Sequence, residues 1–463
     1  MSKDTKIDLL SGNMYRTIIR LGYPLAIGSA VQTLYNLADT FWLGKLGRSA
    51  LSAPVISFNI IFFILSIGIG FSLAGTALVS QYTGSGEKER VHTVTGNLLT
   101  YLLAFAAMFV LVGLALDEEF LRLLKTPADT FAQTLDYYRI MVMGMPLAFP
   151  FFVYYSVMSG YGDTKSPLKL ELLSAVINVV LDPLLIFGWL GFPALGVKGA
   201  ALTTILSRGA ASAVGMWLFF SGRKGIKLSL RHLKPDFRLF SMIFKIGAPA
   251  AVGMSGTSLG FLVLMGIVNR FGTPVISAYG IAMRAVHFFM MPAMGISQAV
   301  TAIVGQNLGA ENIKRAKSAI LKGVHLILLI IVPAMALMAL GGRSITVFFI
   351  PNDPLVHQIG NTMFYIIAPS VVFFAAITVF SGAFQGAGFT VPVMVTNLSR
   401  IWLFRIPLVY LISMVIFGGP TDLRGAIGIW WGMFGSNFLG FLMIFLWYLR
   451  GTWAKARIKE EVK

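Results

Sequence analysis

Residues 21–43 read LGYPLAIGSAVQTLYNLADTFWL. As an α-helix with a rise of 1.5 Å per residue, this run is roughly 34 Å long, enough to cross the hydrocarbon core of a bilayer. Asp39 is its only formal charge. A carboxylate at the bilayer centre costs about 2.5–3.5 kcal/mol, so such a residue usually faces a helix-bundle interior or an ion path. The alternative is a solvated helix end, because Asp39 lies about one turn from Gly44.

The composition indicates a polytopic membrane protein. Of 463 residues, 56% are hydrophobic and only 12% are charged, and the mean hydropathy is +0.78. Cysteine is absent, which excludes disulfides and thiolate metal sites. The polar start MSKDTKIDLLSGN has no small-residue cleavage site after a short apolar core, so we expect no signal peptide. The net charge of +18 fits basic cytoplasmic loops and anionic lipid, and we expect no nucleic-acid partner.

Apolar runs separated by helix breakers predict an all-α fold with twelve transmembrane helices. A polar stretch at 221–238, SGRKGIKLSLRHLKPDFR, separates six spans from six. We therefore predict an N-lobe at 1–222, a cytoplasmic linker at 223–240 and a C-lobe at 241–463. The spans are predicted at 17–43, 52–82, 92–116, 134–160, 166–189, 197–220, 241–268, 277–307, 317–340, 357–386, 391–416 and 425–449.

The distribution of lysine and arginine predicts the orientation. With the N-terminus inside, the inner segments hold 24 of these residues and the outer segments hold 8. Cytoplasmic loops carry the excess of positive charge, so both termini should be cytoplasmic.

An internal repeat relates the two halves of the chain at a constant offset. Gly22 and Pro24 match Gly247 and Pro249, and the register continues through most of each half with one added residue later on. Because each half has an even number of spans, the halves should have the same orientation and form two six-helix bundles related by a pseudo-twofold axis along the membrane normal. Transporters of this type bind substrate between their halves near the midplane.

Two acids lie well inside predicted spans, Asp39 in the first and Asp182 in the fifth. Asn178 precedes Asp182 by four residues and therefore shares its helix face. Thr204 in the sixth span lies at a similar depth below the outer boundary. Two carboxylates in a poorly solvated bundle resist double ionisation, so a proton or a cation should neutralise them.

This cluster predicts an ion-coupling site for H⁺ or Na⁺. Tyr35 lies one turn from Asp39, and Tyr137 should reach the same level. The alternative is a hydrogen-bonded cluster that only ties helices together. Leu264 and Leu408 occupy the repeat positions of the two acids, so coupling should reside in the N-lobe.

Aromatic and methionine-rich groups, at 146–155 and 287–294, are candidates for an adaptable substrate cavity. Such groups more often face lipid or pack within the bundle, and arginine inside a span as often satisfies carbonyl groups or reaches an interface. The candidate cavity residues are Phe149, Phe152, Tyr155, Arg284, His287 and Met291.

An enzyme is not expected. The segment TGSGEKER at 83–90 lacks the spacing of a phosphate-binding loop, and the sequence has no nucleophile, base and orienting group in a recognisable arrangement. We expect no cofactor apart from the coupling ion.

Four blocks resemble the multidrug and toxic compound extrusion (MATE) family, over essentially the whole chain. They are YNLAD (35–39), SGYGDTKSP (159–167), INVVLDPLLIFG (177–188) and LGVKGAALTTILS (195–207). The resemblance implies export of organic cations and other amphipathic compounds against protons or Na⁺. The chain looks like the DinF-type branch, whose N-lobe cation site falls on Asp39, Asn178, Asp182 and Thr204, the residues that would hold Na⁺. It departs from the NorM-type pattern, because the seventh and tenth spans carry no acid.

The predicted function is therefore antiport at the cell membrane by a monomer that meets small-molecule substrates and membrane lipid. Ion entry at the N-lobe cluster would bend or repack the first helix near Pro24 and favour release of cargo. The alternative is a flippase of the related superfamily for lipids or lipid-linked oligosaccharides. There, basic cavity residues would meet pyrophosphate.

Overall fold

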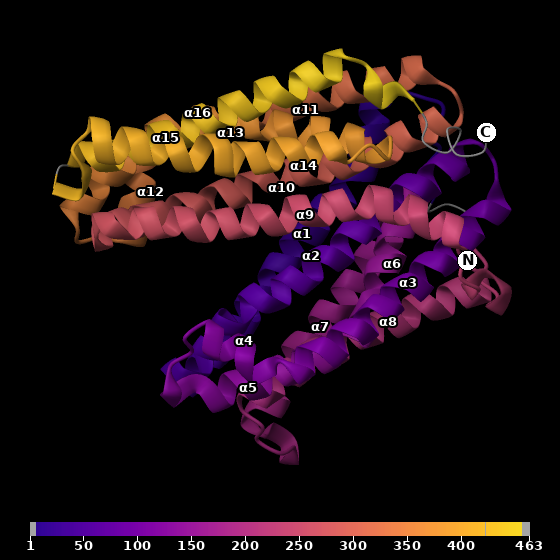
Figure 1. The fold of residues 1–463 in the computed structure, drawn as a ribbon, viewed down its shortest axis with the longest axis horizontal. Helices are drawn as coiled ribbons and strands as arrows, with labels where there is room; N and C mark the ends of the chain where they lie inside the picture. Colours follow the sequence, from indigo (N-terminus) through magenta and orange to yellow (C-terminus); the bar gives the residue numbers. More distant parts are fainter. Residues whose placement is uncertain (1–5, 422, 456–463) are drawn as a thin grey trace. The chain divides into compact units, whose positions relative to one another are not determined.

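The computed structural model describes residues 6–421 and 423–455. All regular secondary structure within these ranges is helical, as Figure 1 shows. This confirms the all-α prediction.

Long helices follow the predicted spans closely. The first half contains α1 (Met14–Leu46), α2 (Arg48–Gly84), α3 (Lys88–Ala115), α4 (Asp117–Leu123), α5 (Ala128–Met143), α6 (Met145–Tyr161), α7 (Lys165–Phe187), η1 (Trp189–Gly191), α8 (Val197–Ser221) and η2 (Leu230–Leu233). The second half contains α9 (Phe237–Val268), η3 (Asn269–Phe271), α10 (Thr273–Gly309), α11 (Ile313–Leu340), α12 (Gly342–Phe349), α13 (Pro354–Gly386), α14 (Val391–Leu398), η4 (Ser399–Arg405), α15 (Ile406–Tyr410), η5 (Leu411–Ile416), η6 (Gly419–Thr421), α16 (Leu423–Leu449) and η7 (Thr452–Ala454).

Membrane-spanning character is clear for most of these helices. Among the described residues, nine helices are long and apolar enough to cross a bilayer, and the pair α5 and α6, bent by 51°, makes a tenth. The eleventh predicted span is the run from α14 to η5, which includes two π-helical stretches. The remaining two predicted spans correspond to α1 and α8, which are less apolar because they carry polar side chains in their middle.

The chain forms two compact units, and each contains a short piece from the other half of the sequence. Of the described residues, unit 1 consists of 6–8 and 27–251, and unit 2 consists of 9–26, 252–421 and 423–455. The chain therefore passes from one unit to the other after Ala26, within α1, and after Ala251, within α9. These two positions are counterparts in the internal repeat, in the same register as Pro24 and Pro249. The lobe boundaries given above stay predictions.

Each unit has a packed helical core. In unit 1, α7 packs against α8, and α6 packs against α2, α3 and α8. In unit 2, α13 lies against α10, α11 and α16, and α16 also packs against the run from η4 to η5.

Two glycines let the short piece of each unit pack closely against the rest of that unit. In unit 1, a Cβ atom on Gly70 would lie 2.6 Å from the backbone nitrogen of Ala251. In unit 2, a Cβ atom on Gly295 would lie 2.5 Å from the carbonyl oxygen of Gly22 and 2.9 Å from Ala26. Gly70 and Gly295 are repeat counterparts, as are Ala26 and Ala251. The same close helix approach is therefore built twice, and only glycine permits it.

Replacement of Gly295 by alanine should destabilise unit 2, because the new methyl group meets backbone atoms that cannot rotate away. We expect Gly295→Ala to lower the unfolding temperature in detergent by several degrees. Tryptophan fluorescence measures this well, since the chain has eight tryptophans and no cysteine for thiol-reactive dyes.

Gly280→Ala is the matched control in the same helix, because no atom lies within 4 Å of its added Cβ. Alanine is favoured over glycine in a helix by about 0.5–1 kcal/mol, so this variant should be unchanged or slightly more stable. Equal unfolding temperatures for the two variants would contradict the close approach at Gly295.

Candidate functional site

One face of α7 is polar over most of its length. Glu171, Ser174, Asn178 and Asp182 follow one another at intervals of three or four residues, which places them on the same side of the helix. All four are buried. A polar row inside a membrane-spanning helix must face other polar groups in the bundle, because lipid offers no hydrogen bonds.

Asp182 is completely buried and receives hydrogen bonds at one carboxylate oxygen. Asn178 Nδ2 donates to Asp182 Oδ1 over 3.4 Å. The hydroxyl group of Thr203, on α8, donates to the same oxygen. Asp182 is thereby held between its own helix and α8.

Close packing of α7 on α8 brings Thr203 to Asp182. A Cβ atom on Gly199 would lie 2.4 Å from the carbonyl oxygen of Leu185, so the absence of a side chain lets the helices approach. Thr203 lies four residues after Gly199, and Asp182 lies three residues before Leu185, so both point along the contact. The GVKGAA block thus positions a hydroxyl group against the buried acid.

The helix α1 brings the second carboxylate to this place. The side chain of Asp39 lies close enough to interact with those of Asp182, Asn178 and Thr204. One turn earlier on α1, the buried hydroxyl group of Tyr35 is 3.2 Å from Ser207 Oγ on α8. The acids that the sequence places in separate spans therefore meet within unit 1.

Tyr137, on α5, completes the surroundings of the acids. Its side chain is buried and lies within electrostatic range of Asp39, Tyr35 and Asp182. A fourth helix thus contributes to the surroundings of the acids.

Several oxygen atoms in this cluster are buried without a hydrogen-bond partner among the described residues. They are Asp39 Oδ1, Asn178 Oδ1, Asp182 Oδ2 and Thr204 Oγ1. Unpaired buried side-chain atoms also occur elsewhere among the described residues, but here four of them belong to side chains that lie close together. Carboxylate, amide and hydroxyl oxygens are the donors that hard cations prefer, and a carboxylate can also take up a proton.

A largely buried ion pair lies on the same helices, next to Tyr35 and Ser207, with its arginine side chain 15% exposed and its glutamate side chain 8% exposed. Arg208 Nη1, on α8, is 3.1 Å from Glu171 on α7, and the Arg208 guanidinium also donates to Gln32 on α1. It lies 5.3 Å from the ring of Tyr35 and 5.0 Å from that of Phe151. One cation thus joins three helices through a carboxylate, an amide and two aromatic rings.

We call the polar residues shared by α1, α7 and α8 the polar seam. They are Gln32, Tyr35, Asp39, Glu171, Ser174, Asn178, Asp182, Thr203, Thr204, Ser207 and Arg208.

Six members of this seam were not predicted from the sequence: Gln32, Glu171, Ser174, Thr203, Ser207 and Arg208. Depth along the membrane predicted Thr204. The direction in which each side chain leaves α8 makes its neighbour Thr203 the donor to Asp182. The spacing of seven and four residues from Glu171 through Asn178 to Asp182 was a usable signal, because it is the repeat of a single helix face.

The predicted cavity residues lie in both units. Phe149 is fully buried in unit 1 and its ring touches Gly68, while Phe152 and Tyr155 are half-buried. In unit 2, Arg284 and His287 are exposed on α10 and Met291 is buried. Pro24 is buried within α1, in the stretch that belongs to unit 2. The roles assigned to these residues stay predictions.

Unit 2 buries two arginines in the eleventh predicted span of the chain. Arg400 and Arg405 both donate to Asn437 Oδ1, over 3.1 and 2.5 Å, and Arg405 also donates to Ser436 Oγ over 2.9 Å. Arg400 Nε has no hydrogen-bond partner among the described residues. No described acid forms an ion pair with either guanidinium.

A repeated membrane fold with a buried oxygen cluster in one half is typical of secondary transporters. The sequence model of the MatE family matches residues 24–184 and again residues 249–411. The two matches begin at Pro24 and Pro249, which are counterparts in the internal repeat. The chain belongs to the MatE family of multidrug efflux transporters.

Relatives and solved structures agree with this assignment. The probable multidrug resistance protein YoeA of Bacillus subtilis is 27% identical over 456 residues, which cover 97% of this chain and 96% of that protein. An FAD transporter of Shewanella oneidensis is 27% identical over 88% of this chain and 90% of its own. An outward-facing multidrug resistance MATE transporter superposes with a TM-score of 0.88 at 22% identity, covering 98% of this chain and all of that chain.

Breaking the ion pair between Glu171 and Arg208 should destabilise the protein strongly, since removal of one partner leaves a buried charge alone. We expect Glu171→Gln and Arg208→Gln each to cost about 3–5 kcal/mol. The double variant should cost less than the sum of the two. Unfolding in a denaturing detergent, followed by tryptophan fluorescence, measures all three.

Glu118→Gln provides the comparison at an exposed ion pair, with Arg122 on α4. Such pairs contribute about 0–1 kcal/mol, so the stability should scarcely change. Additive effects of Glu171→Gln and Arg208→Gln would show that the two side chains are not energetically coupled.

Proposed function

We propose that the chain is a secondary antiporter that exports amphipathic, often cationic, drugs or toxins in exchange for protons, with Na⁺ as the alternative coupling ion. Asp39 and Asp182 take up the ion, and Asn178, Thr204, Tyr35 and Tyr137 surround it. The cell membrane is the location, with both termini cytoplasmic, and the monomer is the working unit.

The observation that carries this proposal is the set of four buried oxygen atoms without hydrogen-bond partners. Two of them belong to acids, Asp39 and Asp182, that lie close enough to interact. Two carboxylates at short range in a poorly solvated bundle cannot both stay charged without a compensating proton or cation. The site is therefore suited to an ion that arrives and leaves.

The exchange follows from the competition between two states of α1. An ion entering from outside neutralises Asp39 and Asp182, which changes how α1 packs near Pro24 and favours the state that releases cargo. Because the coupling between two sites is reciprocal, bound cargo must disfavour the ion by the same factor.

The Asp39→Asn and Asp182→Asn variants should lose ion-driven export. In proteoliposomes loaded with a cationic dye, the unmodified protein should expel dye when a proton gradient is imposed alone. Each variant should fall at least tenfold, because the amide cannot exchange a proton with the outer solution. Fluorescence of the dye gives the rate, with Glu118→Gln as an active control at an exposed acid.

A sodium gradient imposed alone, at equal pH on both sides, distinguishes the coupling ions. Export under the sodium gradient only would replace H⁺ by Na⁺ in the mechanism. Full export by Asp39→Asn and Asp182→Asn under either gradient would contradict the proposed coupling site.

A second candidate function is flipping of an anionic lipid or lipid-linked oligosaccharide, and Arg400 and Arg405 favour it. Two buried guanidinium groups that share one amide oxygen would attract phosphate or pyrophosphate. The relative named as an FAD transporter is relevant here, since FAD itself contains a pyrophosphate.

Binding of two labelled ligands separates the candidates. If flipping is the function, a fluorescent lipid pyrophosphate should bind saturably, and the double variant Arg400→Gln, Arg405→Gln should lose at least tenfold in affinity while Asp39→Asn should not. Saturable binding of a cationic dye, with no lipid pyrophosphate binding, would favour the antiporter alone.

A further inference from the structure

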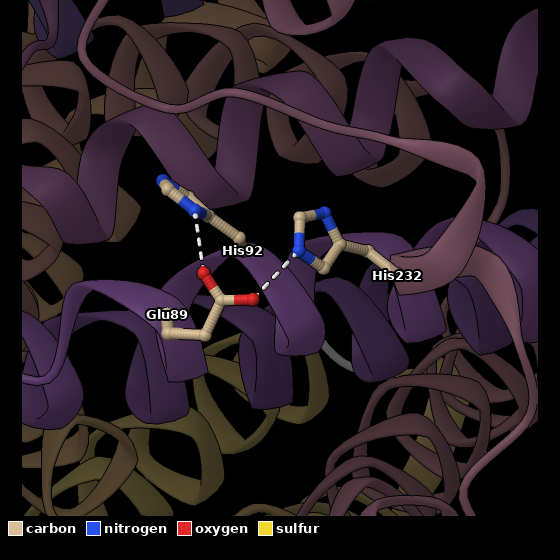
Figure 2. Close-up of side chains that lie close together, drawn as sticks. All are labelled: Glu89, His92 and His232. Atoms are coloured by element: carbon tan, nitrogen blue, oxygen red, sulfur yellow. Dashed lines mark hydrogen bonds and ion pairs between the residues drawn. The ribbon is translucent and has the colours of Figure 1, made fainter.

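Three potential metal ligands meet where the chain between α8 and α9 lies against α3. Figure 2 shows the side chains of Glu89, His92 and His232 turned toward one another. Glu89 and His92 lie one turn apart at the start of α3, and His232 lies in η2. One ligand atom from each residue lies within 4.8 Å of the other two.

We propose that Glu89, His92 and His232 bind one divalent transition-metal ion of the zinc class. This site is separate from the polar seam and does not rest on the antiport mechanism. It consists of two imidazoles and one carboxylate, and leaves a fourth position for water or another ligand. Zn²⁺ accepts this combination of ligands at about 2.0–2.2 Å in tetrahedral geometry.

The three ligand atoms lie within 4.8 Å of one another, so they would have to draw closer together around such an ion. Tetrahedral coordination at those bond lengths separates neighbouring ligand atoms by roughly 3.4 Å. His232 Nε2 is 3.0 Å from Glu89 Oε1, and His92 Nδ1 is 3.6 Å from Glu89 Oε2. The two imidazole ring centres are 5.6 Å apart.

Both imidazoles have contacts besides the Glu89 carboxylate. His232 Nδ1 is 3.1 Å from Ser229 Oγ, which can accept its proton when Nε2 binds the ion. The ring of His92 interacts with the backbone of Gly225 as well as with Glu89. Such outer contacts fix the tautomer and orientation of metal-binding histidines. Moving the proton of His232 to Nδ1 costs free energy, because in this structure Nδ1 accepts a hydrogen bond from the backbone N–H of Ser229.

The backbone that carries His232 is held firmly on α3. Asn97 Nδ2 donates to the His232 carbonyl oxygen over 3.2 Å, and Asn97 Oδ1 accepts from the N–H of Asp236 over 2.8 Å. Thr100 donates to the Leu233 carbonyl oxygen over 2.9 Å. A Cβ atom on Gly96 would lie 2.3 Å from the His232 carbonyl oxygen, so the two segments touch. Ligands on a fixed scaffold need little reorganisation to bind an ion.

Arg231 competes with the ion for the same groups. Its guanidinium lies 2.9 Å from Glu89 Oε1, and its Nε lies 3.3 Å from His232 Nε2. The side chain is 70% exposed, so it can turn into solvent at little cost. Removal of this positive charge should therefore strengthen metal binding. If the three side chains form only an ion-pair cluster, the same change should not raise the affinity for a metal ion.

The test uses the full chain in detergent, purified through a histidine-free tag and stripped of metal with a chelator. Co²⁺ serves as the probe, because its visible absorption reports coordination geometry, and Zn²⁺ is then titrated against a chromophoric chelator. We expect one ion per chain with tetrahedral Co²⁺ absorption. Glu89→Gln and His232→Gln should each weaken binding at least tenfold, and Arg231→Gln should strengthen it several-fold.

His325→Gln is the control, because this exposed histidine lies in unit 2 and contacts Tyr15. It should bind Co²⁺ as the unmodified protein does. Tryptophan fluorescence checks that each variant is folded. Equal Co²⁺ affinity of the unmodified protein and a folded His232→Gln variant would overturn the proposal. So would unchanged or weaker binding by Arg231→Gln, a surface change that leaves all three ligands in place.

Discussion

Burial of the Asp182 carboxylate is the constraint on which the rest of unit 1 depends. The side chain is 0% exposed, and a charge or a polar group in such a place needs partners from the protein. Thr203 supplies one only because α8 approaches α7 at Gly199, and Asp39 reaches the same place only because α1 lies beside both. The surroundings of this one acid thus join side chains from three helices.

The ion pair of Glu171 and Arg208 shows how the same helices handle a permanent charge. Arg208 cannot lose its proton, so its guanidinium is matched with a carboxylate, an amide and two aromatic faces. Around Asp39 and Asp182, in contrast, buried oxygens are left without partners. Unit 1 therefore holds a paired carboxylate and guanidinium next to two acids that each keep one buried oxygen without a hydrogen-bond partner.

Hydropathy and spacing were enough to predict the helices, because a bilayer forces every spanning segment to satisfy its own backbone. The meeting of Asp39, Asn178 and Asp182 was also predictable, since few polar groups lie deep in spans and they must find one another. That Thr203 and not Thr204 donates to Asp182 was not predictable, because it depends on the rotation of α8 about its axis. His92 and His232 looked scattered in sequence, because they lie far apart in the chain and no periodicity links a helix to the segment that folds back onto it. The exchange of chain at Ala26 and Ala251 was equally hidden, since both lie inside uninterrupted helices.

The repeat gives the two halves of the chain equivalent helices, and one pair of equivalent helices buries charges of opposite sign. The helix α7 and the run from α14 to η5 are counterparts, and the first buries Glu171 and Asp182 while the second buries Arg400 and Arg405. Regular α-helix suits the acids, because Glu171, Asn178 and Asp182 lie on one face at intervals of seven and four residues. The arginines lie in a π-helical stretch, whose wider turns allow both to reach the same oxygen of Asn437 over five residues. Buried carboxylates attract cations and buried guanidinium groups attract anions, so the two copies differ in the sign of the charge that they would attract. Duplication preserved the frame, and the substitution of a few side chains gave each unit its own charge preference.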